Sequence, residues 1–200
     1  MREHVADRRV TAIRKAEPIN MESMAALELA VAEWANTGRT TAAIFAWWLL
    51  VGTWASTRFD DLLHVRPHAI TLGADSLRLT AWRTKTSRRG RGVDYSIPRV
   101  GVTDTDWLRT GYDLWRAHAT SSYMQGDFLL PFCDPRAGIE WHSPATLEHF
   151  VATQHIIMTE ALHVAKQATE GLVANANKTT GHSMRCLLYT SDAADEEDSV

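Results

Sequence analysis

Residues 42–55, with the sequence AAIFAWWLLVGTWA, form the most apolar run of the chain and contain no charged side chain. On a helix this run is apolar on nearly every side, which indicates a helix at the centre of a hydrophobic core. Its 14 residues fall short of the roughly 20 that are needed to cross a bilayer. We therefore expect a buried core helix rather than a membrane span, and no membrane partner.

The composition is typical of a folded protein, because 45% of the 200 residues are hydrophobic and 22% are charged. A chain of this length holds one good core, which we expect at residues 18–185, with residues 1–17 as a lead-in or a linker from an upstream domain.

The charged N-terminal region has no apolar segment typical of a secretory signal, so we expect an intracellular protein. Cys133 and Cys186 lie far apart and lack a CxxC partner, which argues against a disulfide framework and a zinc site.

The histidines give no indication of a metal site. We expect core or surface roles for the following, which lack the spacing of metal ligands: His64, His68, His118, His142, His149, His155 and His163. The sequence therefore predicts neither a metal nor another cofactor.

Helical periodicity surrounds the core helix. A helix is predicted after Asn20, a plausible N-cap, with Met24, Leu27, Val31 and Trp34 on its inner face and its end near residues 36–38. Thr40 or Thr41 is the expected cap of the core helix. A short helix follows at Phe59–Val65, and Arg66-Pro67 should end it, because a residue before proline is pushed out of helical geometry.

The period changes to two after residue 68, which predicts a three-stranded antiparallel meander. Its strands are expected at 69–72, around 77–81 and at 93–97, where apolar and polar residues alternate. Another helix should begin at 104–106, residues 120–143 should be loop-rich, and Ser143-Pro144 should begin a long helix to about Gln167, with Leu147 and Phe150 facing inward. The expected fold class is α+β, mostly α-helical, with a small three-stranded antiparallel sheet.

Positive charge is concentrated in residues 83–91, RTKTSRRGR, which contain five basic residues and no acid. Such a loop repels itself unless an anion lies nearby, and phosphate is the natural one. We therefore predict that Arg83, Arg88, Arg89 and Arg91 contact the DNA backbone, although a solvated loop remains an alternative. Lys85 differs from them because a lysine at the end of a strand can be fixed in place and can give up a proton.

Two further groups could address an anion. Arg58 lies at the junction of two predicted helices, three residues before Asp61. His182 and Arg185, in the sequence GHSMR, face the same way if that segment opens a helix. A surface ion pair between Arg58 and Asp61 and a capping role for His182 are the simpler alternatives.

Three motifs follow one another in the chain: TRFDDL with Arg58 and Asp61, RTKT with Lys85, and GHSMR with His182 and Arg185. Their order resembles that in the catalytic domain of tyrosine recombinases, the phage-integrase family. The strand region is similar to that of recombinases from eukaryotic mobile elements. The resemblance implies DNA strand cleavage and rejoining by transesterification through a phosphotyrosine, without a metal or nucleotide energy. It also implies a homo-oligomer on double-stranded DNA, in the nucleus of a eukaryote or otherwise in the cytoplasm.

The resemblance assigns a role to each site residue. Arg58 and Arg185 would clamp the scissile phosphate and offset charge in the transition state. Lys85 would protonate the leaving 5′ oxygen, His182 would assist proton transfer, and Asp61 would buttress Arg58. One departure is that Ser56-Thr57 stands before Arg58, where many family members have glycine followed by leucine or methionine.

A larger departure follows Arg185. The family continues with helices that carry the nucleophilic tyrosine, whereas residues 186–200 read CLLYTSDAADEEDSV, which resembles the translation of a sequencing adapter. We expect this tail to be non-native, the domain to be truncated after the His-x-x-Arg motif, and the fragment to be inactive for lack of a nucleophile, because Tyr189 follows Arg185 too closely. The alternatives are a non-catalytic DNA-binding relative, a type IB topoisomerase-like enzyme and a helical interaction domain.

Overall fold

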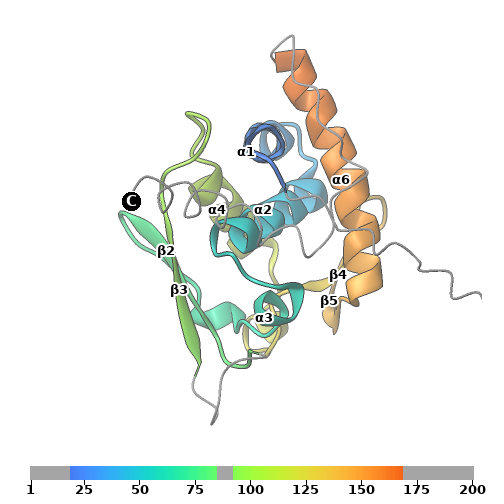
Figure 1. Ribbon diagram of the computed structural model, residues 1–200. Helices are drawn as coiled ribbons and strands as arrows, with labels where there is room; N and C mark the ends of the chain where they lie inside the picture. Colours follow the sequence, from blue (N-terminus) through green and yellow to red (C-terminus); the bar gives the residue numbers. More distant parts are fainter. Residues whose placement is uncertain (1–18, 85–91, 169–200) are drawn as a thin grey trace, which may run out of the picture.

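The structure, a computed structural model, describes residues 19–84 and 92–168 (Figure 1). The elements are, in chain order, α1 (Met21–Asn36), α2 (Thr40–Trp54), α3 (Phe59–Leu63), the 3₁₀ turn η1 (Pro67–Ala69), β1 (Thr71–Leu72), β2 (Ser76–Ala81), β3 (Val93–Pro98), α4 (Trp107–His118), α5 (Ser121–Met124), β4 (Pro131–Asp134), β5 (Gly138–Pro144) and α6 (Leu147–Ala168). This combination of helices with small antiparallel sheets confirms the expected α+β class.

Helix α2 lies at the centre of the core, as its sequence predicts. Every residue from Ala42 to Thr53 is buried. Helices α1, α4 and α6 all pack against α2, and Figure 1 shows it in the middle of them. A helix that is apolar on every side can satisfy all of its faces only in such a position.

Helix α1 also follows its sequence pattern. The side chain of Asn20 accepts a hydrogen bond from the amide of Ser23 at 2.8 Å, which confirms the predicted N-cap. After α1 the chain turns at Gly38, whose φ is 76°. This turn leaves only Arg39 before α2, so Thr40 is already helical and the predicted threonine cap is wrong, because Arg39 is the N-cap and makes no side-chain capping hydrogen bond.

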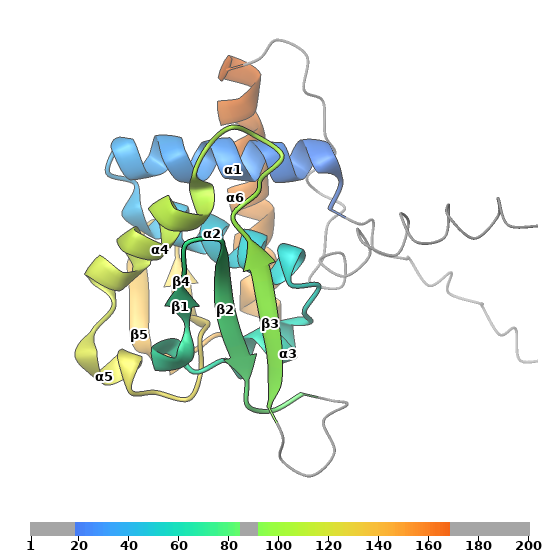
Figure 2. The same cartoon turned by 90° about the vertical axis from the view of Figure 1, so that its left-hand side faces the viewer.

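The three-stranded meander is confirmed, with the order β1-β2-β3 and antiparallel pairing throughout (Figure 2). Leu77, Leu79 and Ala81 of β2 are buried, whereas Arg78 between them is exposed. Strand β1 is shorter than predicted because residues 67–69 form η1. The alternation of buried and exposed side chains along β2 fixes the register of the sheet.

The region between α4 and α6 differs from the prediction. Strands β4 and β5 form an antiparallel hairpin where loops were expected, and Gly138, with φ 112°, lies at its turn. Ser143-Pro144 end β5 instead of beginning α6. Helix α6 begins at Leu147, which is 53% exposed rather than inward, while the hydroxyl of Thr146 accepts from the amide of His149 at 3.2 Å. In the part of the chain that the structure describes, no helix is long and apolar enough to cross a membrane.

Candidate nucleic-acid interface

Arg58 follows a tight turn that ends α2. The amide of Thr57 donates to the carbonyl oxygen of Gly52 at 3.0 Å, and the amide of Ser56 donates to that of Thr53 at 3.0 Å. Ser56 has φ 50°, in the left-handed region that glycine adopts most easily. Ser56 therefore adopts, at the end of α2, a backbone conformation that glycine adopts more easily.

The backbone of Arg58 is held on both sides. Its amide donates to Oδ2 of Asp61 at 3.4 Å, and its carbonyl oxygen accepts from the amide of Leu62 at 2.9 Å. The hydroxyl of the preceding Thr57, which is only 1% exposed, adds a 3.2 Å hydrogen bond to the carbonyl oxygen of Gly52. The half-buried side chain of Arg58 forms no hydrogen bond or ion pair with any residue that the structure describes.

Asp61 supports Arg58 through the backbone and not through the guanidinium. Its side chain is nearly buried, at 4% exposure, and its Oδ1 has no hydrogen-bond partner within the described residues. No ion pair joins the two side chains, although both are described. A buried carboxylate at the first turn of α3 fixes the helix start and leaves the arginine side chain available for another group.

The end of α3 is attached to β2. Val65 forms an isolated bridge with Ala81, and the amide of Trp82 donates to the carbonyl oxygen of His64 at 2.9 Å. This pairing ends α3 at Leu63, two residues before the predicted end. The five residues of α3 span about 7.5 Å at 1.5 Å per residue.

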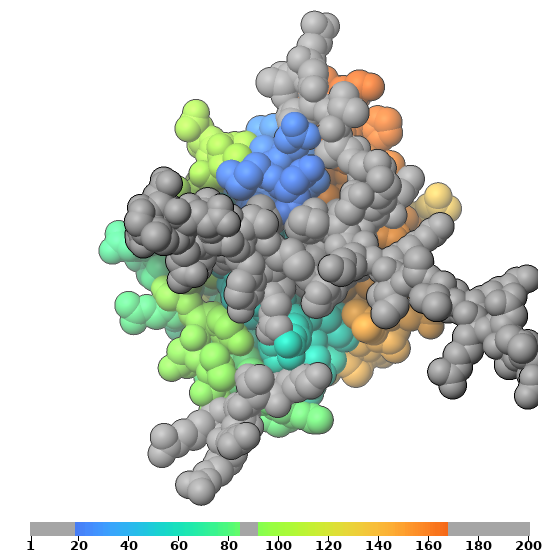
Figure 3. All heavy atoms as spheres, in the orientation of Figure 1, coloured from blue at the N-terminus to red at the C-terminus, as the bar shows by residue number. Residues whose placement is uncertain are grey.

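Consequently, the base of the basic hairpin lies one short helix away from Arg58. Figure 3 shows the teal residues near the junction of α2 and α3 at the surface, between the green hairpin and the orange α6. Arg83 is exposed and Thr84 is buried. These two residues place the start of segment 83–91 beside α3.

The remaining predicted site residues lie outside the described residues. They are Lys85, Arg88, Arg89, Arg91, His182 and Arg185. Their convergence with Arg58 therefore stays a prediction.

A feature that the sequence did not indicate lies at the base of the hairpin. The guanidinium carbon of Arg66 lies 5.7 Å from the ring centroid of Trp82, and the His64 ring approaches the same indole edge-on at 5.1 Å. Arg66 and Trp82 are 16 positions apart in the chain, and the bridge between Val65 and Ala81 and the hydrogen bond from Trp82 to His64 bring them together. No local pattern could have revealed this contact.

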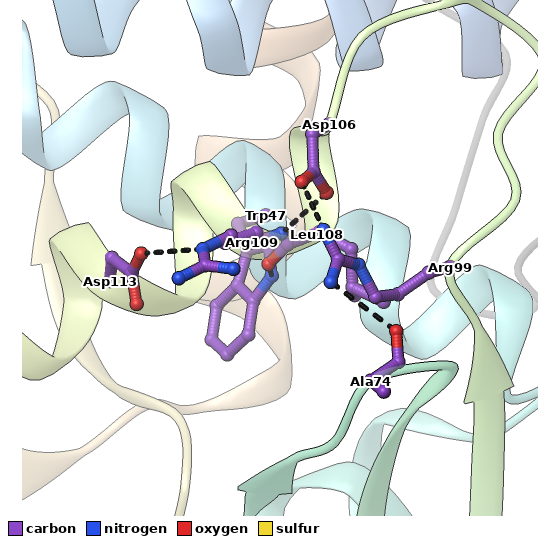
Figure 4. A network of polar contacts seen from close by, with 7 residues as sticks. All are labelled: Trp47, Ala74, Arg99, Asp106, Leu108, Arg109 and Asp113. Atoms are coloured by element: carbon purple, nitrogen blue, oxygen red, sulfur yellow. Dashed lines mark hydrogen bonds and ion pairs between the residues drawn. The ribbon is translucent and has the colours of Figure 1, made fainter.

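A surface cavity of about 690 Å³ lies in a different place in the fold. It lies at the end of β2 and β3 where Ser76 pairs with Pro98, and the basic segment follows the other end, where Ala81 pairs with Val93. Figure 4 shows Arg99, which lines this cavity, bound to the carbonyl oxygen of Ala74 and to Asp106. Three aspartates also line it, so the cavity does not fit an anion: Asp75, Asp104 and Asp106.

The described residues contain no cluster of three or more histidines, cysteines and acids that could hold a metal ion. Cys133 is 1% exposed, and burial, with a smaller contribution from the charge of Asp134, raises the pKa of its thiol to about 12. The neighbouring His149 uses Nε2 to contact the carbonyl oxygen of Cys133 at 2.8 Å and stacks on Phe132 at 3.8 Å. Both residues therefore have structural roles in the packing of the β4–β5 hairpin against α6.

Comparisons of the chain with protein-family models, curated proteins and solved structures find no significant match. The resemblance to tyrosine recombinases thus rests on the sequence motifs.

Proposed function

We propose that this chain is part of a DNA strand-exchange enzyme of the tyrosine-recombinase type, in which Arg58 binds the phosphate at the reaction centre. The observation that carries the proposal is the contrast between the backbone of Arg58, which is bonded on both sides, and its guanidinium, which has no partner among the described residues. A fixed backbone limits the region that the guanidinium can reach, so binding of a ligand there has to order the side chain but not the backbone.

The chemistry of the group fits a phosphodiester. A guanidinium donates two parallel hydrogen bonds to phosphate oxygens and stabilises the charge that develops in a pentacoordinate transition state. Arg185, Lys85 and His182 would complete this set in the roles that the resemblance implies. The nucleophile is not assigned to any residue of this chain.

The first test compares DNA binding by Arg58→Ala and Arg58→Lys with that of the unchanged protein, by fluorescence anisotropy over a range of salt concentrations. Loss of a charge-assisted bidentate contact should weaken binding by about 10-fold for Arg58→Ala, and Arg58→Lys should recover part of it. The matched control is Arg136→Ala, an exposed arginine at the β4–β5 turn. Equal losses for Arg58→Ala and Arg136→Ala would contradict the proposal.

The second test addresses catalysis and the rival functions. Nicked duplex DNA should give no covalent adduct with this chain, and an adduct that disappears on Tyr189→Phe would show that the nucleophile is present.

The rival functions predict other results. If the chain is a helical interaction domain, it should show no salt-dependent DNA binding at all. Relaxation of supercoiled DNA would favour the type IB topoisomerase-like alternative. In any longer protein that contains this segment, the lack of a tyrosine that forms the adduct would favour a non-catalytic relative.

A further inference from the structure

We propose that Arg66, which stacks on Trp82, and Arg83, which follows Trp82 in the chain, form an additional contact with the DNA phosphate backbone. This inference rests on the proposed function, since it assumes that the chain binds DNA. It differs from the Arg58 site because its two arginines would hold the backbone without taking part in the reaction.

The indole of Trp82 is fixed in place. Its amide donates to the carbonyl oxygen of His64 at 2.9 Å, and its Nε1 donates to the carbonyl oxygen of Asp127 at 2.7 Å. The edge of the His64 ring contacts it at 5.1 Å between centroids. A half-buried aromatic ring with these contacts is a rigid surface for a cation.

Arg66 lies over this ring. Its guanidinium carbon is 5.7 Å from the ring centroid, and the side chain is exposed and has no ion pair with a carboxylate of the described chain. A guanidinium within about 6 Å of an aromatic centroid gains a cation–π attraction while its N–H edges stay free to donate. The stacking therefore holds Arg66 in position before a ligand arrives, which lowers the entropic cost of binding.

The backbone around Arg66 is also restricted. Pro67 follows it and keeps it extended, with ψ 124°, and the bridge between Val65 and Ala81 holds it beside the end of β2. Arg83 comes directly after Trp82 and is exposed. Two arginines from separate segments are thus held on one short stretch of the surface.

The charges nearby include both signs. Asp60, an acid on α3, lies beside His64, with 3.5 Å between its Oδ1 and Nδ1 of His64. Asp127 uses its backbone oxygen for Trp82, and its side chain is exposed. Arg83 is the first of five basic residues in the sequence 83–91, which contains no acid, and this excess of positive charge in the sequence favours a polyanion such as a phosphate backbone.

The experiment measures binding of the full chain to a fluorescein-labelled duplex of mixed sequence as a function of salt. Arg66→Gln should weaken binding about 3- to 10-fold and reduce the slope of log K against log salt by about 1, because one phosphate contact is lost. The affinity of Arg66→Lys should lie between those of the unchanged protein and Arg66→Gln, since lysine keeps the charge without the planar stacking group. Arg136→Gln, at the β4–β5 turn, serves as the control and should leave the slope unchanged.

Trp82 provides an independent variant. Trp82→Phe keeps an aromatic face under Arg66 and should retain most of the affinity. Trp82→Leu removes the stacking but leaves the charge of Arg66, so its affinity should lie between those of the unchanged protein and Arg66→Gln. The double variant Arg66→Gln/Trp82→Leu should be no weaker than Arg66→Gln, because the stacking acts only through Arg66. Thermal unfolding of each variant separates a loss of binding from a loss of folding.

The outcomes distinguish this inference from the proposed function. If Arg58→Ala and Arg83→Gln weaken binding while Arg66→Gln binds as the unchanged protein does, the Arg66 contact is refuted and the proposed function stands. If the unchanged protein shows no salt-dependent DNA binding, both fail. Additive losses for the Arg66 and Trp82 variants would also refute the stacked arrangement.

Discussion

The indole of Trp47 on α2 occupies the space that a side chain at position 111 on α4 would need. A Cβ added to Gly111 would lie 2.3 Å from Cδ1 of Trp47, far inside van der Waals contact. Trp47 cannot move aside easily, because its Nε1 donates to the carbonyl oxygen of Leu108 at 3.1 Å, as Figure 4 shows, and its ring stacks on Trp115 at 5.4 Å. Gly111 thus sets the close approach of α2 and α4.

Gly111→Ala should destabilise the protein by about 1–2 kcal/mol. Alanine is favoured over glycine inside a helix by about 1 kcal/mol. Overpacking against a fully buried tryptophan costs about 1–3 kcal/mol or more. Because the added Cβ would lie only 2.3 Å from Cδ1 of Trp47, the cost of overpacking should be larger than the gain. Chemical denaturation measures the difference. The matched control is Gly73→Ala, because a Cβ at that position would meet only the carbonyl oxygen of Ser76, at 3.4 Å. This substitution should change the free energy of unfolding by less than about 0.5 kcal/mol.

Ser56 should respond to substitution according to its left-handed backbone, with φ 50°. Ser56→Gly removes the conformational strain and should be neutral or stabilising by up to about 1 kcal/mol. Ser56→Val should cost about 1–2 kcal/mol, because β-branched side chains are poorly accommodated there. The free energy of unfolding of the two variants gives the answer, and an equal effect of glycine and valine would show that this turn is not strained.

Glu28 should be a strong determinant of stability. This fully buried carboxylate on α1 accepts hydrogen bonds from the amides of Val102 and Thr103 at 3.0 and 2.8 Å, and from the hydroxyl of Thr103 at 2.8 Å. Glu28→Ala leaves these donors unpaired and should cost about 2–4 kcal/mol, measured by urea unfolding. Glu33→Ala, at an exposed position of the same helix, should cost under about 0.5 kcal/mol.

The thiol of Cys133 should be inert in the folded protein. Since burial raises its pKa to about 12, very little thiolate exists at pH 8, and the thiolate is the reactive form. In a Cys186→Ser background, where Cys133 is the remaining cysteine, Ellman's reagent should react at least about 100-fold more slowly with the folded protein than with the protein in guanidinium. The reaction rate of the folded protein should rise as the pH approaches 12, provided that the fold persists. Rapid labelling of folded protein at pH 8 would contradict the buried placement.

The sequence by itself determined the elements whose signals are local. The all-apolar run Ala42–Ala55, the amphipathic spacing after Asn20 and the alternation along β2 each specify a conformation and a buried face within one segment, so α1, α2 and the three-stranded sheet could be predicted. The motif with Arg58 and Asp61 was also visible in the sequence, and the structure shows that the Arg58 amide donates to Asp61 Oδ2; the roles of the two residues in a site stay a prediction.

Only the tertiary structure decided the features that depend on pairing between distant segments. The β4–β5 hairpin, and with it the late start of α6 at Leu147, arises because its two strands satisfy each other's backbone groups. The bridge between Val65 and Ala81 ends α3 early and places Arg66 over Trp82. Asp61 binds the backbone of Arg58, whose side chain has no partner among the described residues, a distinction that residue identity cannot make. Hydrogen bonds and ring contacts between remote residues leave no periodic signal in a sequence, because they are fixed only when the chain has folded.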